Sequence, residues 1–424
     1  MNAGEEERQT GTKACVIGIR SERRLQEQAR LSAEELKALV EAAGAEVVDE
    51  IFCNTSIIHP KTYIGTGKVE EIKERLEESR VSIAVLDVSL TPSQQRNLEN
   101  YWNIQVIDRT GIILDIFAKR AASREGRLQV ELALLEYRLP RLTRMWTHLS
   151  RLGAGIGTRG PGETQLEVDR RRIRTRILKL KEELKQIEKR RELQRENRRR
   201  TGVNTVALVG YTNAGKSTLL NLLTLADVSV KDQLFETLDS TIRQLILPDN
   251  QPLYLVDTVG FISRLPHQLI AAFHATLEEV VQADLLLHVI NSASPQRDEQ
   301  IRDVETVLKQ LGVEQTPIIR VYNKIDLLDE WEVGDITRLQ DSVAISAQKK
   351  LGIDLLLRKL MDFLMSQEKK VEMLIPYSQG SIIAVIRDKS RILSEIFEPE
   401  GVRLQIVGKH ALLNKYKEFI DRDF

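Results

Sequence analysis

The sequence predicts a multi-domain α/β protein, and three observations lead to this fold class. Short apolar runs typical of buried strands alternate with helical segments through much of the chain. One stretch reads G-x-x-x-x-G-K-S directly after an apolar run, which is the order strand, phosphate-binding loop and helix. A third, long segment carries apolar residues at helical spacing. We therefore expect a small N-terminal parallel α/β domain (1–123), a basic helical hairpin or coiled coil (124–200), a P-loop domain (201–367) and a short α+β C-terminal domain (368–424).

The composition of the 424-residue chain is that of an ordinary globular protein. It has 62 basic and 62 acidic residues, which argues against a uniformly polycationic nucleic-acid binder. Cys15 and Cys53 lie in or beside apolar runs and form no disulfide framework or metal-ligand pattern. No apolar run is long enough to cross a membrane, and the N-terminus lacks the apolar core of a signal peptide. We expect a cytoplasmic monomer without a membrane span.

The N-terminal unit alternates predicted strands (13–19, 45–52, 83–87, 104–108) with predicted helices (32–43, 68–78, 92–102). Ser32, with Glu35 three residues later, is interpreted as a capping box at the start of the first helix, and Gly44 as its stop. The segment Thr62–Lys68 has two glycines before a helix. An anion-binding turn, and with it a second nucleotide site, is one interpretation of it, and a plain turn is the favoured one.

The middle unit is predicted to be a helical hairpin with strong local basic charge. Residues 128–139 have a helical pattern, 153–162 form a glycine-rich connector, and a long helix covers about 163–199. The apolar seam of the long helix is Leu166, Ile173, Ile177, Leu180, Leu184 and Ile187, with Arg170 at one seam position. Over residues 170–200, fifteen Lys or Arg stand against five Glu. This excess favours contact of the helix and the 153–162 loop with folded RNA or the ribosome over a merely solvated helix face.

The C-terminal unit is predicted to have strands over 371–376, 381–386 and 402–407 and a helix over 390–397. No residue in it carries a recognisable chemistry.

The P-loop comprises Gly210, Tyr211, Thr212, Asn213, Ala214, Gly215, Lys216 and Ser217. Backbone N–H groups of such a loop, and of the helix that follows, point at phosphates, where the helix dipole favours negative charge. We expect Lys216 to reach the β- and γ-phosphates and the Ser217 hydroxyl to bind Mg²⁺. A chance glycine turn is the alternative, and the flanking strand and helix argue against it.

Three further motifs stand at predicted strand ends. Asp257, Thr258, Val259 and Gly260 read D-x-x-G, in which the Asp holds the Mg²⁺ sphere and the Gly N–H contacts the γ-phosphate. Asn323, Lys324, Ile325 and Asp326 read N-K-x-D, whose Asp accepts two hydrogen bonds from the guanine edge. Ser346, Ala347 and Gln348 supply a backbone N–H for the guanine oxygen. Together with the P-loop, these motifs predict binding of GTP or GDP with Mg²⁺.

This motif set is the signature of the translation-factor-related GTPases, and the chain resembles HflX-type GTPases over nearly its whole length. The resemblance rests on the nucleotide motifs together with Phe235, Glu236, Thr237, Leu238 and Asp239, and on the family-specific segments 126–133 and 160–167. It implies a Ras-like GTPase domain with Thr237 as a Mg²⁺ ligand beside Ser217. It also implies a GTP hydrolase that binds the large ribosomal subunit and splits stalled or idle ribosomes, and it suggests ATP binding by the N-terminal domain.

Phe261 follows the D-x-x-G glycine, where Ras-type GTPases have a Gln that orients the attacking water. Because a phenyl ring has no donor or acceptor for that task, the catalytic group stays unassigned, and we expect slow intrinsic hydrolysis that the ribosome stimulates. Two other functions stay open: a GTPase of large-subunit assembly, and a non-hydrolysing RNA-binding scaffold. The intact Lys216, Ser217, Asp257 and Asp326 argue against the scaffold.

Overall fold

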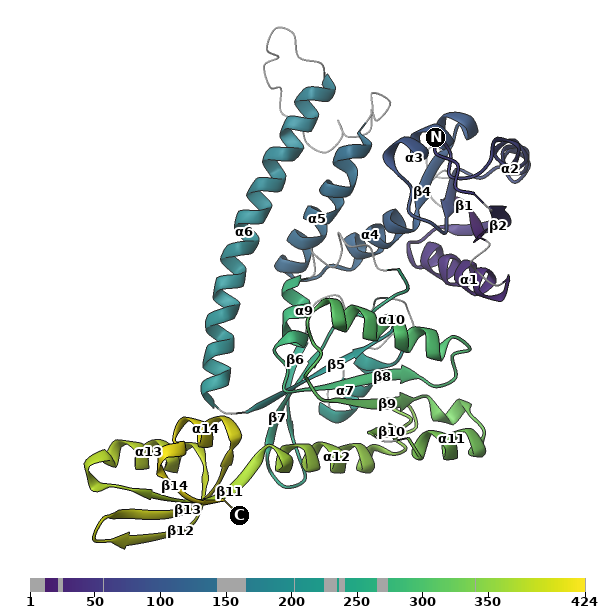
Figure 1. The fold of residues 1–424 in the computed structure, drawn as a ribbon. Helices are drawn as coiled ribbons and strands as arrows, with labels where there is room; N and C mark the ends of the chain where they lie inside the picture. Colours follow the sequence, from purple (N-terminus) through teal and green to yellow (C-terminus); the bar gives the residue numbers. More distant parts are fainter. Residues whose placement is uncertain are drawn as a thin grey trace, which may run out of the picture.

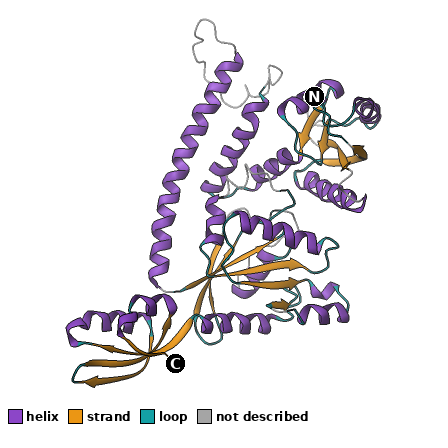
Figure 2. Ribbon diagram, in the orientation of Figure 1, coloured by secondary structure: helices purple, strands orange, loops and turns teal. Residues whose placement is uncertain are grey.

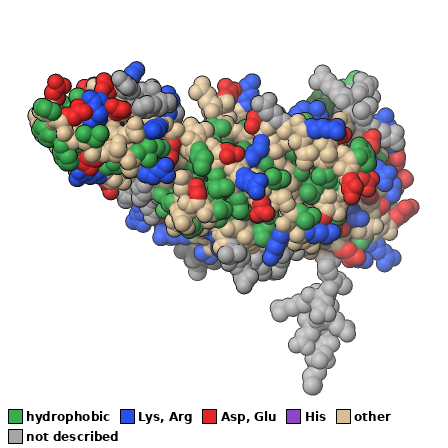
Figure 3. Space-filling view, turned by 90° about the horizontal axis from the view of Figure 1, so that it is seen from below, with side chains coloured by type: hydrophobic (Ala, Val, Ile, Leu, Met, Phe, Trp, Pro, Cys, Tyr) green, Lys and Arg blue, Asp and Glu red, His purple; other side chains and the backbone are tan. Residues whose placement is uncertain are grey.

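The computed structural model of the chain describes residues 12–21, 26–55, 57–142, 165–201, 203–224, 235, 241–264, 274–339 and 341–423. Figure 1 shows an N-terminal α/β domain, a two-helix arm, a central P-loop domain and a small C-terminal domain. Within the described ranges, no helix is long and apolar enough to span a bilayer. The face drawn in Figure 3 mixes basic, acidic and apolar side chains.

The N-terminal domain is a parallel four-stranded sheet in the order β2-β1-β3-β4. Its strands are β1 (Lys13–Ser21), β2 (Glu46–Thr55), β3 (Ile83–Leu86) and β4 (Gln105–Asp108), and its helices are α1 (Gln26–Ala42), α2 (Thr66–Glu78), α3 (Pro92–Trp102) and α4 (Arg109–Arg120). Ala14 and Val16 of β1 pack with α1 and α4, whereas Cys15 and Ile17 pack with α2 and α3. Helices therefore cover both faces of the sheet, as a parallel sheet requires.

The capping box predicted at Ser32 is wrong. Helix α1 begins at Gln26, six residues earlier, so Ser32 is an interior helix residue. Its hydroxyl donates to Asp87 Oδ2 at 2.7 Å, and Glu35 on the same helix forms an ion pair with Arg109. Ser32 and Glu35 thus belong to a face of α1 that contacts other elements. The predicted helix stop at Gly44, with φ of +86°, is confirmed.

The middle unit consists of α5 (Arg124–Arg138), a 3₁₀ turn η2 (Leu139–Arg141) and α6 (Gln165–Thr201), and its two helices lie side by side (Figure 2). The predicted seam is confirmed, because its members share one apolar cluster with Leu128 and Leu132 of α5: Leu166, Ile173, Ile177, Leu180, Leu184 and Ile187. A bidentate ion pair between Arg176 and Glu131, with both N–O distances 2.7 Å, adds a polar link. The 153–162 connector lies outside the described residues.

The P-loop domain is a six-stranded sheet in the order β10-β9-β8-β5-β7-β6, in which only β6 is antiparallel to its neighbour. Its elements are β5 (Asn204–Gly210), α7 (Lys216–Thr224), β6 (Thr241–Ile246), β7 (Pro252–Asp257), α9 (His274–Val281), β8 (Leu285–Asn291), α10 (Arg297–Gln310), β9 (Ile318–Asn323), η4 (Ile325–Leu327), α11 (Glu330–Thr337), β10 (Ser342–Ala344) and α12 (Ile353–Ser366). Since the carboxyl ends of parallel strands meet at one edge, the loops that carry the four motifs meet there.

The C-terminal domain has βαββαβ topology, a ferredoxin-like arrangement with the sheet order β12-β13-β11-β14. Its elements are β11 (Glu368–Ile375), η5 (Tyr377–Gln379), α13 (Gly380–Lys389), β12 (Arg391–Glu398), β13 (Gly401–Lys409), α14 (His410–Lys415), η6 (Lys417–Phe419) and β14 (Ile420–Asp423). Two predictions here are wrong: 381–386 is helical, and 390–397 is a strand. The β-branched run 381–386 forms a helix because it buries Ile386 against the sheet, and such packing overrides intrinsic propensity.

Candidate guanine-nucleotide site

The backbone of the P-loop has the conformation that its glycines predicted. Strand β5 ends at Gly210, and α7 begins at Lys216, so the loop N–H groups and the helix N-terminus converge on one point. Gly215 has φ of +91°, and a Cβ added to it would lie 2.3 Å from Asn323 Nδ2. Both the left-handed conformation and the close approach require glycine at this position.

Lys216 is almost fully buried, with 6% of its surface exposed. Its ammonium donates to the carbonyl oxygens of Gly210 and Tyr211, at 3.1 and 2.9 Å. Burial lowers the pKa of Lys216 to about 8, although the Asp257 carboxylate acts in the opposite direction. The lysine thus lies folded over its own loop, at the place where phosphate oxygens are expected to bind.

The side chains that the motifs predict to hold Mg²⁺, among the described residues, have the chemistry that this ion requires. Ser217 Oγ donates to Asp257 Oδ2 at 2.8 Å, so a hydroxyl and a carboxylate lie together beside the P-loop lysine. These are hard oxygen donors of the kind that Mg²⁺ prefers, usually with substrate phosphates and waters completing the octahedron. Thr237 and its neighbours Glu236, Leu238 and Asp239 lie outside the described residues, so the second predicted ligand stays a prediction.

The guanine end of the site is held together by Asn323, which is 2% exposed. Its Nδ2 donates to Ala214 O, and its Oδ1 accepts from the Ala347 N–H, each at 2.9 Å. Lys324 has φ of +65° and donates to Asn213 Oδ1 at 3.4 Å. The N-K-x-D motif therefore joins the P-loop on one side to the Ser346–Gln348 loop on the other.

Asp326 is poised as an ionised acceptor. A hydrogen bond from the Ser346 side chain is the main reason why the pKa of Asp326 lies below its ordinary value, and Lys349, with its Nζ 3.8 Å from Oδ2, contributes. A carboxylate kept in the charged form can accept two hydrogen bonds from the N1–H and amine of guanine. The structure thus brings together the residues predicted to read the base.

The D-x-x-G loop lies directly on the P-loop. Phe261 N donates to Gly210 O at 3.0 Å, and Thr212 N donates to Phe261 O at 2.7 Å. A Cβ added to Gly260 would lie 3.1 Å from Lys216 Nζ. The backbone of Gly260 and the Lys216 ammonium therefore lie close together, and we expect a γ-phosphate that binds between them to move the two loops apart.

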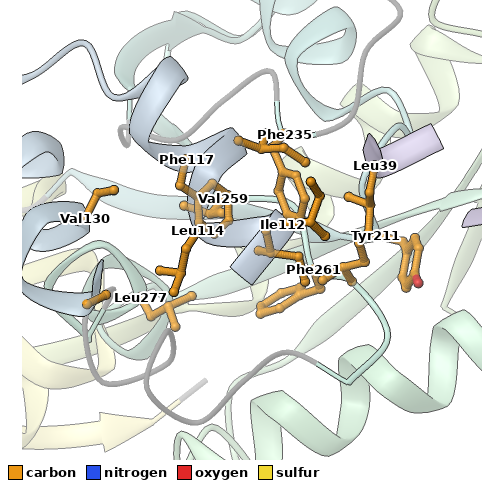
Figure 4. Close-up of a cluster of buried hydrophobic side chains, with 14 of the residues drawn as sticks. Leu39, Ile112, Leu114, Phe117, Val130, Tyr211, Phe235, Val259, Phe261 and Leu277 are labelled. Atoms are coloured by element: carbon orange, nitrogen blue, oxygen red, sulfur yellow. The ribbon is translucent and has the colours of Figure 1, made fainter. Parts of the chain in front are cut away.

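Apolar side chains of this loop form one core with the N-terminal domain (Figure 4). Phe261 is 2% exposed and packs in the same cluster as Ile112 and Leu114 of α4. Phe235 is buried edge-on against Phe117, with ring centroids 4.6 Å apart and planes at 72°. The Phe261 ring is thus used in packing between domains, and Phe235, predicted near the nucleotide, packs there as well.

A polar network connects the same two domains beside this core. Tyr211 donates its hydroxyl hydrogen to Glu35 and accepts from the Ser263 N–H at 2.7 Å. Arg109, 2% exposed, pairs with Glu35 and with Asp87, the latter at 3.0 Å. Arg264 Nη2 donates to Ser32 Oγ at 3.0 Å, and its Nη1 donates to the Asp87 carbonyl oxygen at 3.3 Å.

None of the N-terminal residues in this network was predicted to bear on the nucleotide site. Asp87 and Arg109 stand at the carboxyl ends of β3 and β4, the edge at which open α/β sheets bind ligands. The sequence alone could have pointed to Asp87 and Arg109, because the ends of both strands were predicted correctly. What fills the edge here is Arg264, from the loop after D-x-x-G.

The turn before α2 makes the local contacts of an ordinary turn. Thr62 Oγ1 donates to Ile64 O at 2.6 Å, and Lys68 pairs with Glu71 one helical turn later at 2.5 Å. Both polar side chains are thus engaged within the turn and the helix itself. ATP binding by this domain stays a prediction.

The fold and these contacts define a guanine-nucleotide-binding P-loop protein of the translation-factor-related class. Family models match three stretches of the chain: "GTP-binding GTPase N-terminal" over residues 30–118, "GTP-binding GTPase Middle Region" over 120–198, and "50S ribosome-binding GTPase" over 205–324. A GTP-binding protein from the archaeon Sulfolobus solfataricus, solved in complex with GDP, is 26% identical, with a TM-score of 0.43 over 83% of this chain and 98% of that one.

Curated relatives are similar over most of their length. GTPase HflX of Caldanaerobacter subterraneus is 48% identical over 91% of this chain and 89% of its own. GTPase HflX of Escherichia coli is 44% identical over 92% of this chain and 93% of its own. The chain belongs to the HflX family of GTPases, and it hydrolyses GTP.

Proposed function

We propose that this GTPase binds the large ribosomal subunit through its basic arm and couples GTP binding and hydrolysis, with Mg²⁺, to the splitting of stalled or idle ribosomes. The observation that carries the proposal is the distribution of charge on α6. Some basic residues of α6 are held by α5, as Arg176 is by Glu131 and Lys181 by Glu136. Others are exposed on the outer side of the helix: Arg172, Arg174, Lys179, Lys185 and Lys189.

Exposed basic side chains along one long helix favour a polyanion as partner. Contact with phosphates releases counterions, so such binding weakens steeply with salt. The family description "50S ribosome-binding GTPase", which matches the P-loop domain, supports ribosomal RNA as that polyanion. In this proposal α5 and α6 contact the RNA at a distance from the nucleotide. Changes at the P-loop are transmitted to these helices through the packed domains.

Hydrolysis by the unbound protein is slow in this proposal. Phe261 cannot orient a water molecule, and its ring is buried in the core shared with the N-terminal domain. In this proposal the ribosome supplies the missing catalytic group, so that hydrolysis is coupled to the docked state. For GTPases whose activators supply a missing group, that group is worth about 10³–10⁵ in rate.

Two measurements test the proposal. Sedimentation with purified ribosomes and large subunits should show binding with a non-hydrolysable GTP analogue, weaker binding with GDP, and fewer intact ribosomes in the presence of the analogue. The paired change Arg172→Glu and Arg174→Glu should weaken binding and flatten its salt dependence, whereas Lys309→Glu with Arg358→Glu, exposed basic residues on α10 and α12, serves as the matched control.

Single-turnover hydrolysis, with and without large subunits, tests the coupling. Equal rates with and without subunits would show that the catalytic site is complete in the unbound protein. Binding to precursor particles but not to mature ribosomes would favour a role in subunit assembly. Absence of binding to either would leave a GTPase with another partner.

A further inference from the structure

Helix α11 and the turn before it form an exposed surface that the nucleotide site does not use. Trp331 is 68% exposed and Leu327 is 65% exposed. Trp is among the residues most enriched at binding hot spots. Figure 1 places α11 at the far side of the P-loop domain from the basic helix α6.

The same surface is strongly acidic. Residues 327–335 contain Asp329, Glu330, Glu332 and Asp335 and no Lys or Arg. Arg338 pairs with Asp335 at 3.3 Å, but among the described residues no basic side chain pairs with Asp329, Glu330 or Glu332. The charge of this surface is therefore opposite to that of α6.

A pocket of about 280 Å³ opens beside these residues. Leu328 and Glu332, the neighbours in sequence of Leu327 and Trp331, form one wall, and the loop from Ser292 to Asp298 forms the other. Ser292 is 4% exposed, and its Oγ has no hydrogen-bond partner within the described part of the chain. A buried hydroxyl without a partner costs free energy unless a ligand supplies the hydrogen bond.

We propose that the α11 surface, defined by Leu327, Leu328, Glu330, Trp331, Glu332 and Ser292, docks a basic protein of the large ribosomal subunit. A Lys or Arg side chain of that protein enters the pocket, where its stem packs on Leu328, its cation lies near Glu332, and it donates to Ser292 Oγ. Trp331 covers the contact as its apolar anchor and offers its ring face to a neighbouring cation. Arg297, which also lines the pocket, forms an ion pair with Asp298 at 3.4 Å. The inference rests on the proposed ribosome binding.

Opposite charge distinguishes a basic protein from RNA as the occupant. An acidic surface is repelled by phosphates and attracted by Lys and Arg. Whether a charge-reversing substitution weakens or strengthens binding therefore identifies the kind of partner. Glu330→Lys weakens binding if the surface faces a basic protein, and it strengthens binding if the surface faces RNA.

The experiment measures affinity for purified large subunits with a GTP analogue, at several salt concentrations. We expect Trp331→Ala to weaken binding about tenfold or more, as for a hot-spot residue, and Glu330→Lys to weaken it most at low salt. Matched controls are Leu355→Ala and Asp354→Lys, an exposed apolar residue and an exposed first-turn acid on α12, which should change nothing. Because Trp331 is exposed, its removal opens no core, and unchanged GDP binding confirms folding.

A photo-crosslinking amino acid at position 327 then identifies the partner. A crosslink to a ribosomal protein that survives ribonuclease supports the inference. A crosslink to RNA, tighter binding by Glu330→Lys, or wild-type affinity for both α11 variants overturns it while leaving ribosome binding intact. Failure of the wild-type protein to bind subunits overturns the inference and the proposed function together.

Discussion

The Tyr211 hydroxyl joins the P-loop, the loop after D-x-x-G and the N-terminal domain. Tyr211→Phe removes its bonds to Glu35 and to the Ser263 N–H and keeps the ring in the apolar core. Burial, first of all, and the Glu35 charge raise the pKa of Tyr211, so the hydroxyl keeps its proton and serves as donor at any working pH. The change therefore tests whether these contacts hold the two loops together.

The magnitude follows from the half-buried groups that lose a hydrogen-bond partner. The 2.7 Å bond from the half-buried Ser263 N–H is lost, and a donor left without its partner costs about 1–3 kcal/mol. That cost falls on the arrangement in which Gly260 lies close to Lys216, and the γ-phosphate is the group that we expect to move them apart. GDP affinity should therefore stay constant, while affinity for a GTP analogue rises relative to it by about 5–150-fold, the factor that corresponds to this free energy.

Titration of the nucleotide-free protein with fluorescent GDP and GTP analogues measures this ratio. Tyr254→Phe is the matched control, because it removes a tyrosine hydroxyl from β7 of the same domain, away from the N-terminal contacts. Glu35→Ala should reproduce most of the effect, and the double variant should add little to it. A ratio of affinities equal to that of the wild type in both Tyr211→Phe and Glu35→Ala would refute the reasoning.

Three further outcomes are expected at the nucleotide site. Asp326→Asn should shift the preference from GTP towards XTP, whose 2-oxo group replaces the guanine amine, and competition binding that still favours GTP would contradict the assigned role. Nucleotide binding at about pH 9 should take up close to one proton, because burial lowers the pKa of Lys216 to about 8 and phosphate oxygens favour its charged form. Calorimetry in buffers of different ionisation enthalpy measures this uptake, which should vanish near pH 6, where both forms are protonated. Gly215→Ala should lower the free energy of unfolding by about 1–3 kcal/mol in urea titrations, because its φ is +91° and its Cβ would lie 2.3 Å from Asn323 Nδ2; wild-type stability would show that the loop can rearrange.

Sequence reasoning could predict the nucleotide site because the motifs that define it are local patterns. The P-loop, D-x-x-G, N-K-x-D and Ser346–Gln348 each depend on a strand end and a few following residues. Parallel strands then bring these ends to one edge without further information. The α5–α6 seam was predictable for the same reason, since helical periodicity alone selects the buried side chains.

The C-terminal domain shows where local patterns fail. Residues 381–386 and 390–397 each fit a helix or a strand by composition, and the choice depends on which arrangement buries Ile386, Leu404 and Val371 together. That information is in the packing of distant segments. It is absent from any short window of the sequence.

The contact between the N-terminal domain and the D-x-x-G loop was likewise decided by tertiary structure. Ser32 and Glu35 have the spacing of a capping box, but an earlier helix start and a facing Arg109 give them a different role. The same holds for Phe261: its sequence position shows that it cannot orient water, and only the fold shows what its ring packs against. The turn of a P-loop and the start of the helix after it depend on hydrogen bonds between near neighbours in the chain, so the sequence alone predicts them. Buried ion pairs and interdomain cores depend on which distant surfaces meet, and that follows from burying the most apolar area of the whole molecule at once.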